Sequence, residues 1–196
     1  MLLVGCVSTR MTSMIDPMHN GKKFGTILVM SLHERSDVAE GFEHAMVGKL
    51  RNTGVKAHPN RRVLPPIREY TVDEKREQYQ RYGIDAILII TPQGASTATV
   101  TIPTYSETRA AAKGTQYTAS GRSQTVTVDG GVRKVVTAIS TQAQLINLDN
   151  GAPVWQGDAE TEIGRYAEMD DIAASFCSRT AEILDGYGLL NIPETK

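Results

Sequence analysis

The sequence is poor in cysteine and in aromatic residues and has nearly balanced charge, and these features exclude several classes of protein. Its 196 residues include two cysteines, Cys6 and Cys177, too few for the disulfide framework of a small secreted domain. Lysine and arginine number 21 against 22 aspartates and glutamates, so the charge gives no support to nucleic-acid binding. Hydrophobic residues make up 40% of the chain, which predicts one globular domain.

Long hydrophobic runs are also missing. The longest apolar runs, Thr26–Met30 and Ala86–Ile90, have the length of strands. A membrane-spanning helix needs about 20 apolar residues. The sequence therefore predicts that no helix of this chain crosses a membrane.

Catalytic and metal-binding motifs are absent as well. The four histidines are scattered, and the His33-Glu34 pair lacks the second histidine of a His-Glu-x-x-His zinc motif. Neither the Gly-x-Ser-x-Gly turn of hydrolases nor a glycine-rich phosphate loop occurs. We therefore expect no enzyme, no metal site and no cofactor.

The N-terminus carries the clearest motif. Leu3-Val4-Gly5-Cys6 has the small residues and the thiol of a lipoprotein processing site. A signal peptide also needs a basic start and about 7–15 apolar residues, which do not precede Cys6 here. We interpret residues 1–23 as a truncated lipoprotein signal with lipidation at Cys6, followed by a flexible tether over 7–23 that contains Pro17 and Gly21. The alternative is an ordinary first strand with a buried Cys6.

The pattern from 24 to 90 predicts a β-α-β-α-β order. Branched apolar residues over 24–32 and 84–90 predict two buried strands, and 55–58 predicts a short third one. Between them lie two helices, one from Ser36 that is capped by Asp37 with Glu40, and one from Thr71 to Tyr82.

Alternating, Thr-rich segments from 91 to 148 predict an antiparallel meander with long hairpins. Asp129-Gly130-Gly131 is typical of a tight turn, and 105–121 lacks any pattern. Another turn at 149–151 leads to a return strand over 153–157.

The last segment predicts the clearest amphipathic helix, from 170 to 186. Asp170 or Asp171 would cap it, and its buried face would end with Tyr187. The fold class expected is α/β (α+β): a mixed sheet with a β-α-β-α-β start, an antiparallel meander and a C-terminal helix on the sheet. One domain would cover 24–190, with a β-hairpin insertion at about 91–145.

The processing site, the strand 27–32, and the segments YGIDAILII (82–90) and LINLDNGAPVWQG (145–157) together resemble one group of proteins. These are bacterial periplasmic lipoproteins with a curli-secretion-channel-type domain. Penicillin-binding-protein activators and the N-terminal domain of the Tol translocation protein belong to the same superfamily. The resemblance implies a non-enzymatic envelope protein that binds partners.

The resemblance and the motif at Cys6 give the functional expectation. We expect a non-catalytic interaction or envelope-assembly module on the periplasmic face of the outer membrane of a Gram-negative cell. The anchor would be the lipid at Cys6, and the lipoprotein sorting rule implies the outer membrane because Val7 rather than Asp follows Cys6. The partner would be an envelope protein. The alternatives are an oligomeric secretion-channel subunit, which makes a homo-oligomer, and a periplasmic enzyme. The candidate binding residues are Tyr105, Arg109, Tyr117 and Trp155.

Overall fold

The computed structural model describes the backbone of residues 7–19, 21–109, 124–163 and 167–193, and the side chains of these ranges except 95, 97–109 and 124–136. Its strands are β1 (Ser8–Ile15), β2 (Thr26–Ser31), β3 (Lys56–Pro59), β4 (Ala86–Arg109), β5 (Gln124–Asn147) and β6 (Pro153–Ile163). Its helices are α1 (Ser36–Asn52), α2 (Asn60–Val63), α3 (Val72–Tyr82) and α4 (Met169–Gly186).

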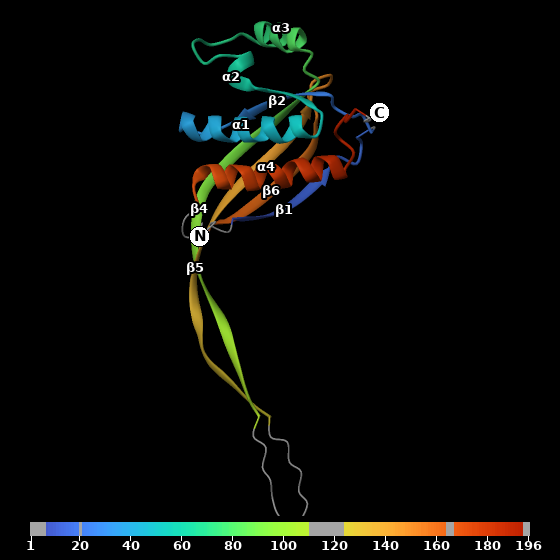
Figure 1. The fold of residues 1–196 in the computed structure, drawn as a ribbon. Coiled ribbons are helices and arrows are strands. Elements are labelled where there is room, and N and C mark those ends of the chain that lie inside the picture. The colour runs from blue at the N-terminus through green and yellow to red at the C-terminus, as the bar shows by residue number, and fades with distance from the viewer. Residues whose placement is uncertain (1–6, 20, 110–123, 164–166, 194–196) are drawn as a thin grey trace, which may run out of the picture. The chain divides into compact units, whose positions relative to one another are not determined.

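The six strands form one mixed sheet in the order β1-β6-β5-β4-β2-β3. β2 runs parallel to both β3 and β4, whereas β6 runs antiparallel to both β5 and β1. The two long helices, α1 and α4, cover the same face of this sheet (Figure 1). The predicted fold class, a mixed sheet with a C-terminal helix packed on it, is confirmed.

The main core lies between the sheet and these two helices. Phe42 of α1 and Phe176 of α4 meet edge to face with ring centroids 5.8 Å apart, and both are fully buried. Trp155 of β6 joins the same cluster with 2% of its surface exposed. Burial of aromatic side chains of this size supplies much of the driving force for folding.

A smaller core lies on the opposite face, at the β2 end of the sheet. Leu28 of β2 packs there against Val63 and Leu64 of the α2 segment, and Tyr79 of α3 packs against the cluster. The predicted capping box of α3 is confirmed, because Thr71 Oγ1 accepts the N–H of Glu74 and Glu74 accepts the N–H of Thr71. Helix α3 itself has no buried residue.

Strands β4 and β5 extend into a second compact unit. Unit 1 comprises residues 1–96 and 137–196, and unit 2 comprises Thr97–Val136. The predicted tight turn at Asp129-Gly130-Gly131 is wrong, because β5 runs through it from Gln124 to Asn147. An Asp-Gly-Gly triplet permits a turn but does not enforce one where a strand can pair along its whole length.

The N-terminal segment differs from the predicted tether. Residues Ser8–Ile15 form β1, which pairs with β6 over its whole length, from Ser8 opposite Glu162 to Ile15 opposite Trp155. The flexible tether over 7–23 is therefore wrong for these residues. The strand that orders these residues, β6, lies far along the chain. The local composition of 7–23 therefore could not predict the pairing.

Three details of the helices also differ from expectation. Arg35, not Asp37, is the N-cap of α1, and Asp37 instead forms an ion pair with Arg35. Glu168 is the N-cap of α4, while Asp171 completes a capping box with it. Tyr187 is 43% exposed rather than buried. Within the described residues, no helix is both long and apolar enough to cross a membrane.

Candidate functional site

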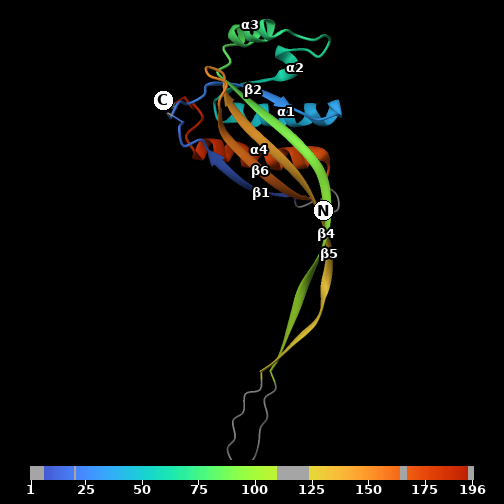
Figure 2. The ribbon, with the colours of Figure 1, turned by 180° about the vertical axis from the view of Figure 1, so that it is seen from behind.

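The face of the sheet opposite α1 and α4 carries a polar hollow over β1, β6 and β5. Seen from behind, β1, β6 and β5 lie in front of α4 with no helix before them (Figure 2). Even-numbered residues of these strands face this side because side chains alternate along a strand. Their exposed or half-buried members are polar except for Met14 and Ile146.

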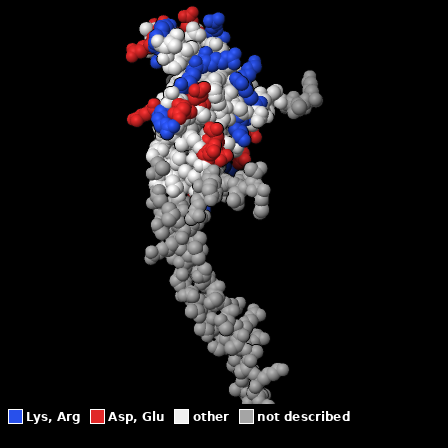
Figure 3. Space-filling model, turned by 60° about the vertical axis from the view of Figure 1, so that its left-hand side comes forward, with Lys and Arg blue, Asp and Glu red and all other residues white. Residues whose placement is uncertain are grey.

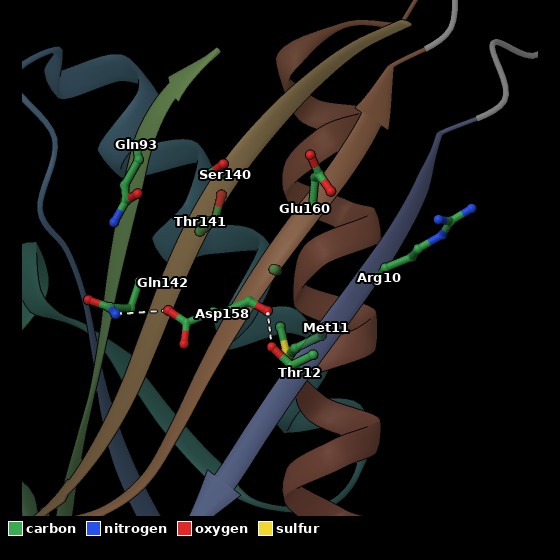
Figure 4. A pocket seen from close by; sticks show the side chains of 10 residues that line it. Arg10, Met11, Thr12, Gln93, Ser140, Thr141, Gln142, Asp158 and Glu160 are labelled. Carbon is green, nitrogen blue, oxygen red and sulfur yellow. Dashed lines mark hydrogen bonds between the residues drawn. The ribbon is translucent and has the colours of Figure 1, made fainter. Parts of the chain in front are cut away.

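Cross-strand neighbours form polar rows on this face. Glu160 of β6 lies between Arg10 of β1 and Ser140 of β5, and Asp158 lies between Thr12 and Gln142. With Gln93 of β4, these side chains line a hollow of about 440 Å³ (Figure 4). The strand pairing therefore brings together polar groups from four strands of the sheet.

Hydrogen bonds hold Asp158 at the centre of this hollow. Its Oδ1 accepts a hydrogen bond from Gln142 Nε2 at 2.8 Å, and its Oδ2 accepts one from Gln156 Nε2 at 3.3 Å. The hydroxyl of Thr12 donates to the Asp158 carbonyl at 3.5 Å. The carboxylate is thus oriented by two amides, and the surface presents acceptors and donors that suit a hydrogen-bonding partner.

The side chains that line the hollow are suited to hydrogen bonding with a polar partner. Its lining holds no cysteine and no histidine. Among the residues that the structure describes, no three His, Cys, Asp or Glu side chains are grouped to hold a metal ion. The hollow offers carboxylates, amides, hydroxyls and one guanidinium, which bind polar surfaces but lack an activated nucleophile.

Charge on the described surface is mixed. In the view of Figure 3, lysine and arginine side chains alternate with aspartate and glutamate over unit 1, and neither sign dominates. At the hollow itself, Arg10 lies 3.7 Å from Glu162, and the Arg10 side chain is 83% exposed. An exposed pair of this kind contributes little to stability and leaves Arg10 available to a partner.

None of the residues predicted from the sequence is among the described residues that line this hollow. Cys6 and Tyr117 lie outside the described residues. Tyr105 and Arg109 lie in the part of β4 for which the structure describes only the backbone. Trp155 lies in the core, so its indole is not available at the surface. The sequence does not identify the residues of the hollow, because the alternation over 137–148 predicts a strand but not which strands lie beside it.

The two remaining titratable groups of interest are buried. Cys177 is fully buried in α4, its thiol donates to the Phe42 carbonyl at 3.8 Å, and burial raises the pKa of the thiol. This thiol is therefore inert, since the thiolate is the reactive form. Glu43 of α1 is 2% exposed and accepts the backbone N–H of Ser31 at 3.2 Å and that of Arg61 at 3.5 Å. Burial raises the pKa of its carboxyl group.

Comparison with known proteins gives no family. No protein-family model matches the sequence. No curated protein matches it either. The chain is similar to solved structures at low identity: the PelC dodecamer of Paraburkholderia phytofirmans has 15% identity and a TM-score of 0.48 over 95% of this chain and 99% of that one.

Two further solved structures are comparable. A variant of the same PelC dodecamer in another crystal form has 15% identity and a TM-score of 0.47 over 92% of this chain and 98% of that one. A PDZ domain protein of Parabacteroides distasonis has 10% identity and a TM-score of 0.42, over 97% of this chain and 37% of that one. Scores this low do not establish a shared fold or a shared function.

Proposed function

We propose that this chain is a lipid-anchored protein of the bacterial cell envelope that binds partner proteins and has no catalytic role. The processing motif Leu3-Val4-Gly5-Cys6 and the resemblance of segments 82–90 and 145–157 to envelope lipoproteins support the anchor. The open polar face around Asp158, whose side chains offer hydrogen bonds but no activated nucleophile, supports a binding role.

The observation that carries the proposed anchor is the processing motif that ends at Cys6, and an ordered strand follows it closely. β1 begins at Ser8, two residues after Cys6, so the anchor would lie within about 7 Å of the sheet. At that end of unit 1, Ser8 lies opposite Glu162 and Thr137 lies opposite Ile163. An anchor at Cys6 would therefore join the sheet at the end where β1 and the unit 1 part of β5 begin.

Metabolic labelling with a fatty-acid probe tests the anchor. The protein, expressed with the upstream sequence of its own gene, should take up label and fractionate with the outer membrane. A Cys6→Ser variant should lose the label, whereas Cys177→Ala should keep it, because Cys177 is buried in the core. Label on the Cys6→Ser variant would contradict the proposal.

A second candidate function is that of a subunit in an oligomeric secretion assembly. The length of the β4–β5 hairpin favours it. Residues 97–109 of β4 and 124–136 of β5 lie in unit 2. Strands of this length reach about 40 Å, more than the roughly 30 Å of a bilayer core.

The mass of the protein after extraction in detergent separates the two candidates. The interaction module should be a monomer or should carry another protein. The secretion subunit should form large particles of this chain alone, and a variant with Thr97–Val136 deleted should no longer form them. A monomer that carries no partner would exclude the second candidate.

A further inference from the structure

The two edges of the sheet differ in how they are closed. β3 is four residues long and ends at Pro59, which has no N–H to donate. The guanidinium of Arg51 donates to the outward carbonyl of Ala57 from Nε at 3.1 Å and from Nη2 at 2.7 Å. A short edge capped in this way cannot accept another strand.

The β1 edge is longer and carries less protection. Its eight residues, Ser8–Ile15, contain one charged residue, Arg10, and no proline. Asp16 donates its N–H to the Val154 carbonyl at 2.9 Å, in line with the β1–β6 register. Because bonded residues alternate in an antiparallel ladder, even-numbered residues bond to β6, and the N–H and C=O groups of Thr9 and Met11 face the open edge.

A groove follows the first half of this edge. It has a volume of about 450 Å³ and lies between β1 and α4. Its α4 wall is made largely of small side chains, Ala174, Ser175 and Ser178, and Thr9 Oγ1 lies 2.8 Å from Ser175 Oγ at the contact between the strand and the helix. Towards the other end of β1, the Tyr187 hydroxyl donates to the Ser13 carbonyl at 3.4 Å. Within the part of the chain that the structure describes, the open part of the edge therefore lies beside the groove, upstream of Ser13.

We propose that this groove binds an extended segment of a partner protein, which adds a strand beside Val7–Met11. Backbone groups of Thr9 and Met11 would pair with the segment, as in other complexes that form by strand addition. Alternate side chains of the partner segment would enter the groove. The small α4 residues that line the groove would favour small, uncharged side chains in that segment. Arg179 and Glu182 at the rim are 3.2 Å apart, so the rim attracts neither charge strongly.

A second copy of this chain suits the site less well, and this step rests on the proposed lipid anchor. Two β1 strands paired antiparallel would point their Cys6 ends in opposite directions, roughly 20–40 Å apart along the strands. Anchors at opposite ends would not hold both sheets by the same end at one membrane. A segment of a different protein has no such constraint.

The test uses the full-length chain with Cys6→Ser, so that it does not depend on lipidation. Random decapeptides displayed on phage would be selected against this protein, and the enriched peptide would be synthesised. We expect it to slow amide hydrogen exchange at Thr9 and Met11. Exchange at Thr12, whose N–H already bonds to β6, should change little.

A Ser178→Phe variant should fill the groove and weaken binding by about tenfold or more, as a bulky ring at the centre of an interface does. Ser178→Ala, which leaves the groove open, should bind as the parent does. Failure to enrich any peptide, or protection away from Thr9 and Met11, would overturn the proposal. So would a dimer of the peptide-free protein that protects these same two amides, because the occupant would then be a second copy.

Discussion

Gly157 leaves the space that the indole ring of Trp155 occupies. A β-carbon added to Gly157 would lie 2.6 Å from Cη2 of Trp155 and 3.1 Å from Sδ of Met11. Positions 155 and 157 of β6 both face the helices, and the indole ring of Trp155 leans along the strand across Gly157. We therefore expect Gly157→Ala to lower the free energy of unfolding by about 1–3 kcal/mol, as overpacking does.

Denaturant unfolding measures this effect, and Gly48→Ala is the matched control. Gly48 lies in α1, and no atom lies within 4 Å of the β-carbon that the substitution adds. The control should raise the free energy of unfolding by roughly 0.5–1 kcal/mol, because glycine weakens a helix interior. Equal effects of the two substitutions would show that the Trp155 contact does not constrain Gly157.

The same pair of residues shows how far the sequence could predict the fold. The turn at 149–151 was enough to identify 153–157 as a return strand. That Trp155 is a core residue rather than a surface anchor depends on α4, which packs on this face of the sheet from a later part of the chain. Local patterns find elements, whereas the face that an element buries is decided by packing between distant segments.

β1 and the polar hollow are two features that the sequence alone could not predict. The apolar residues of 8–15, which are Met11, Met14 and Ile15, do not alternate regularly with polar ones. The segment is ordered by pairing with β6 about 150 positions later. Arg10 and Asp158 become neighbours of one hollow only through that pairing. Because the alternating pattern of a strand does not specify its partner, the sequence alone predicted neither the strand nor the hollow.

Glu43 should make stability depend on pH. Burial raises the pKa of its carboxyl group in the folded protein above the ordinary value of 4.5. The protonated form therefore favours folding: its contribution is complete below about pH 4.5 and is lost as the pH rises through the raised pKa. Glu43→Gln keeps the size of the side chain but cannot titrate.

Urea unfolding of both proteins across a series from about pH 4 to about pH 7 measures the difference. The free energy of unfolding of the parent, minus that of Glu43→Gln, should fall as the pH rises. The titratable groups that both proteins share contribute equally to both free energies, so their pH dependence cancels in this difference. A difference that stays constant or rises with pH would contradict the assignment.

Thr71→Ala should destabilise α3 without unfolding the core. The substitution removes the hydroxyl that accepts the Glu74 N–H, and loss of such a cap costs about 1 kcal/mol. Because α3 buries no residue of its own, the cost should appear as local opening. Amide exchange in 75–82 should become about fivefold faster, while exchange in α1 stays unchanged.

Asp73→Asn is the control for this helix. Asp73 lies in the first turn, its side chain is 92% exposed, and its contact with Arg76 is 3.4 Å long. An exposed pair of this kind contributes little, so exchange in α3 should change much less than in Thr71→Ala. If the two variants accelerate exchange equally, the capping box is not what holds the start of α3.

Unit 1 should fold without unit 2. Both hydrophobic clusters of the described chain are built from residues before Ser96 and after Thr137, with Leu88 and Leu145 as examples on β4 and β5. Replacing Thr97–Val136 by an Asn-Gly turn should therefore leave a cooperative unfolding transition near that of the parent, since this turn suits a two-residue hairpin. Loss of the transition would mean that unit 2 is part of the folding unit.

The shortened protein should still take up the lipid label at Cys6, because the proposed processing motif lies in the retained segment. A folded, labelled, monomeric variant of a parent that forms large particles would assign assembly to unit 2 and anchoring to unit 1.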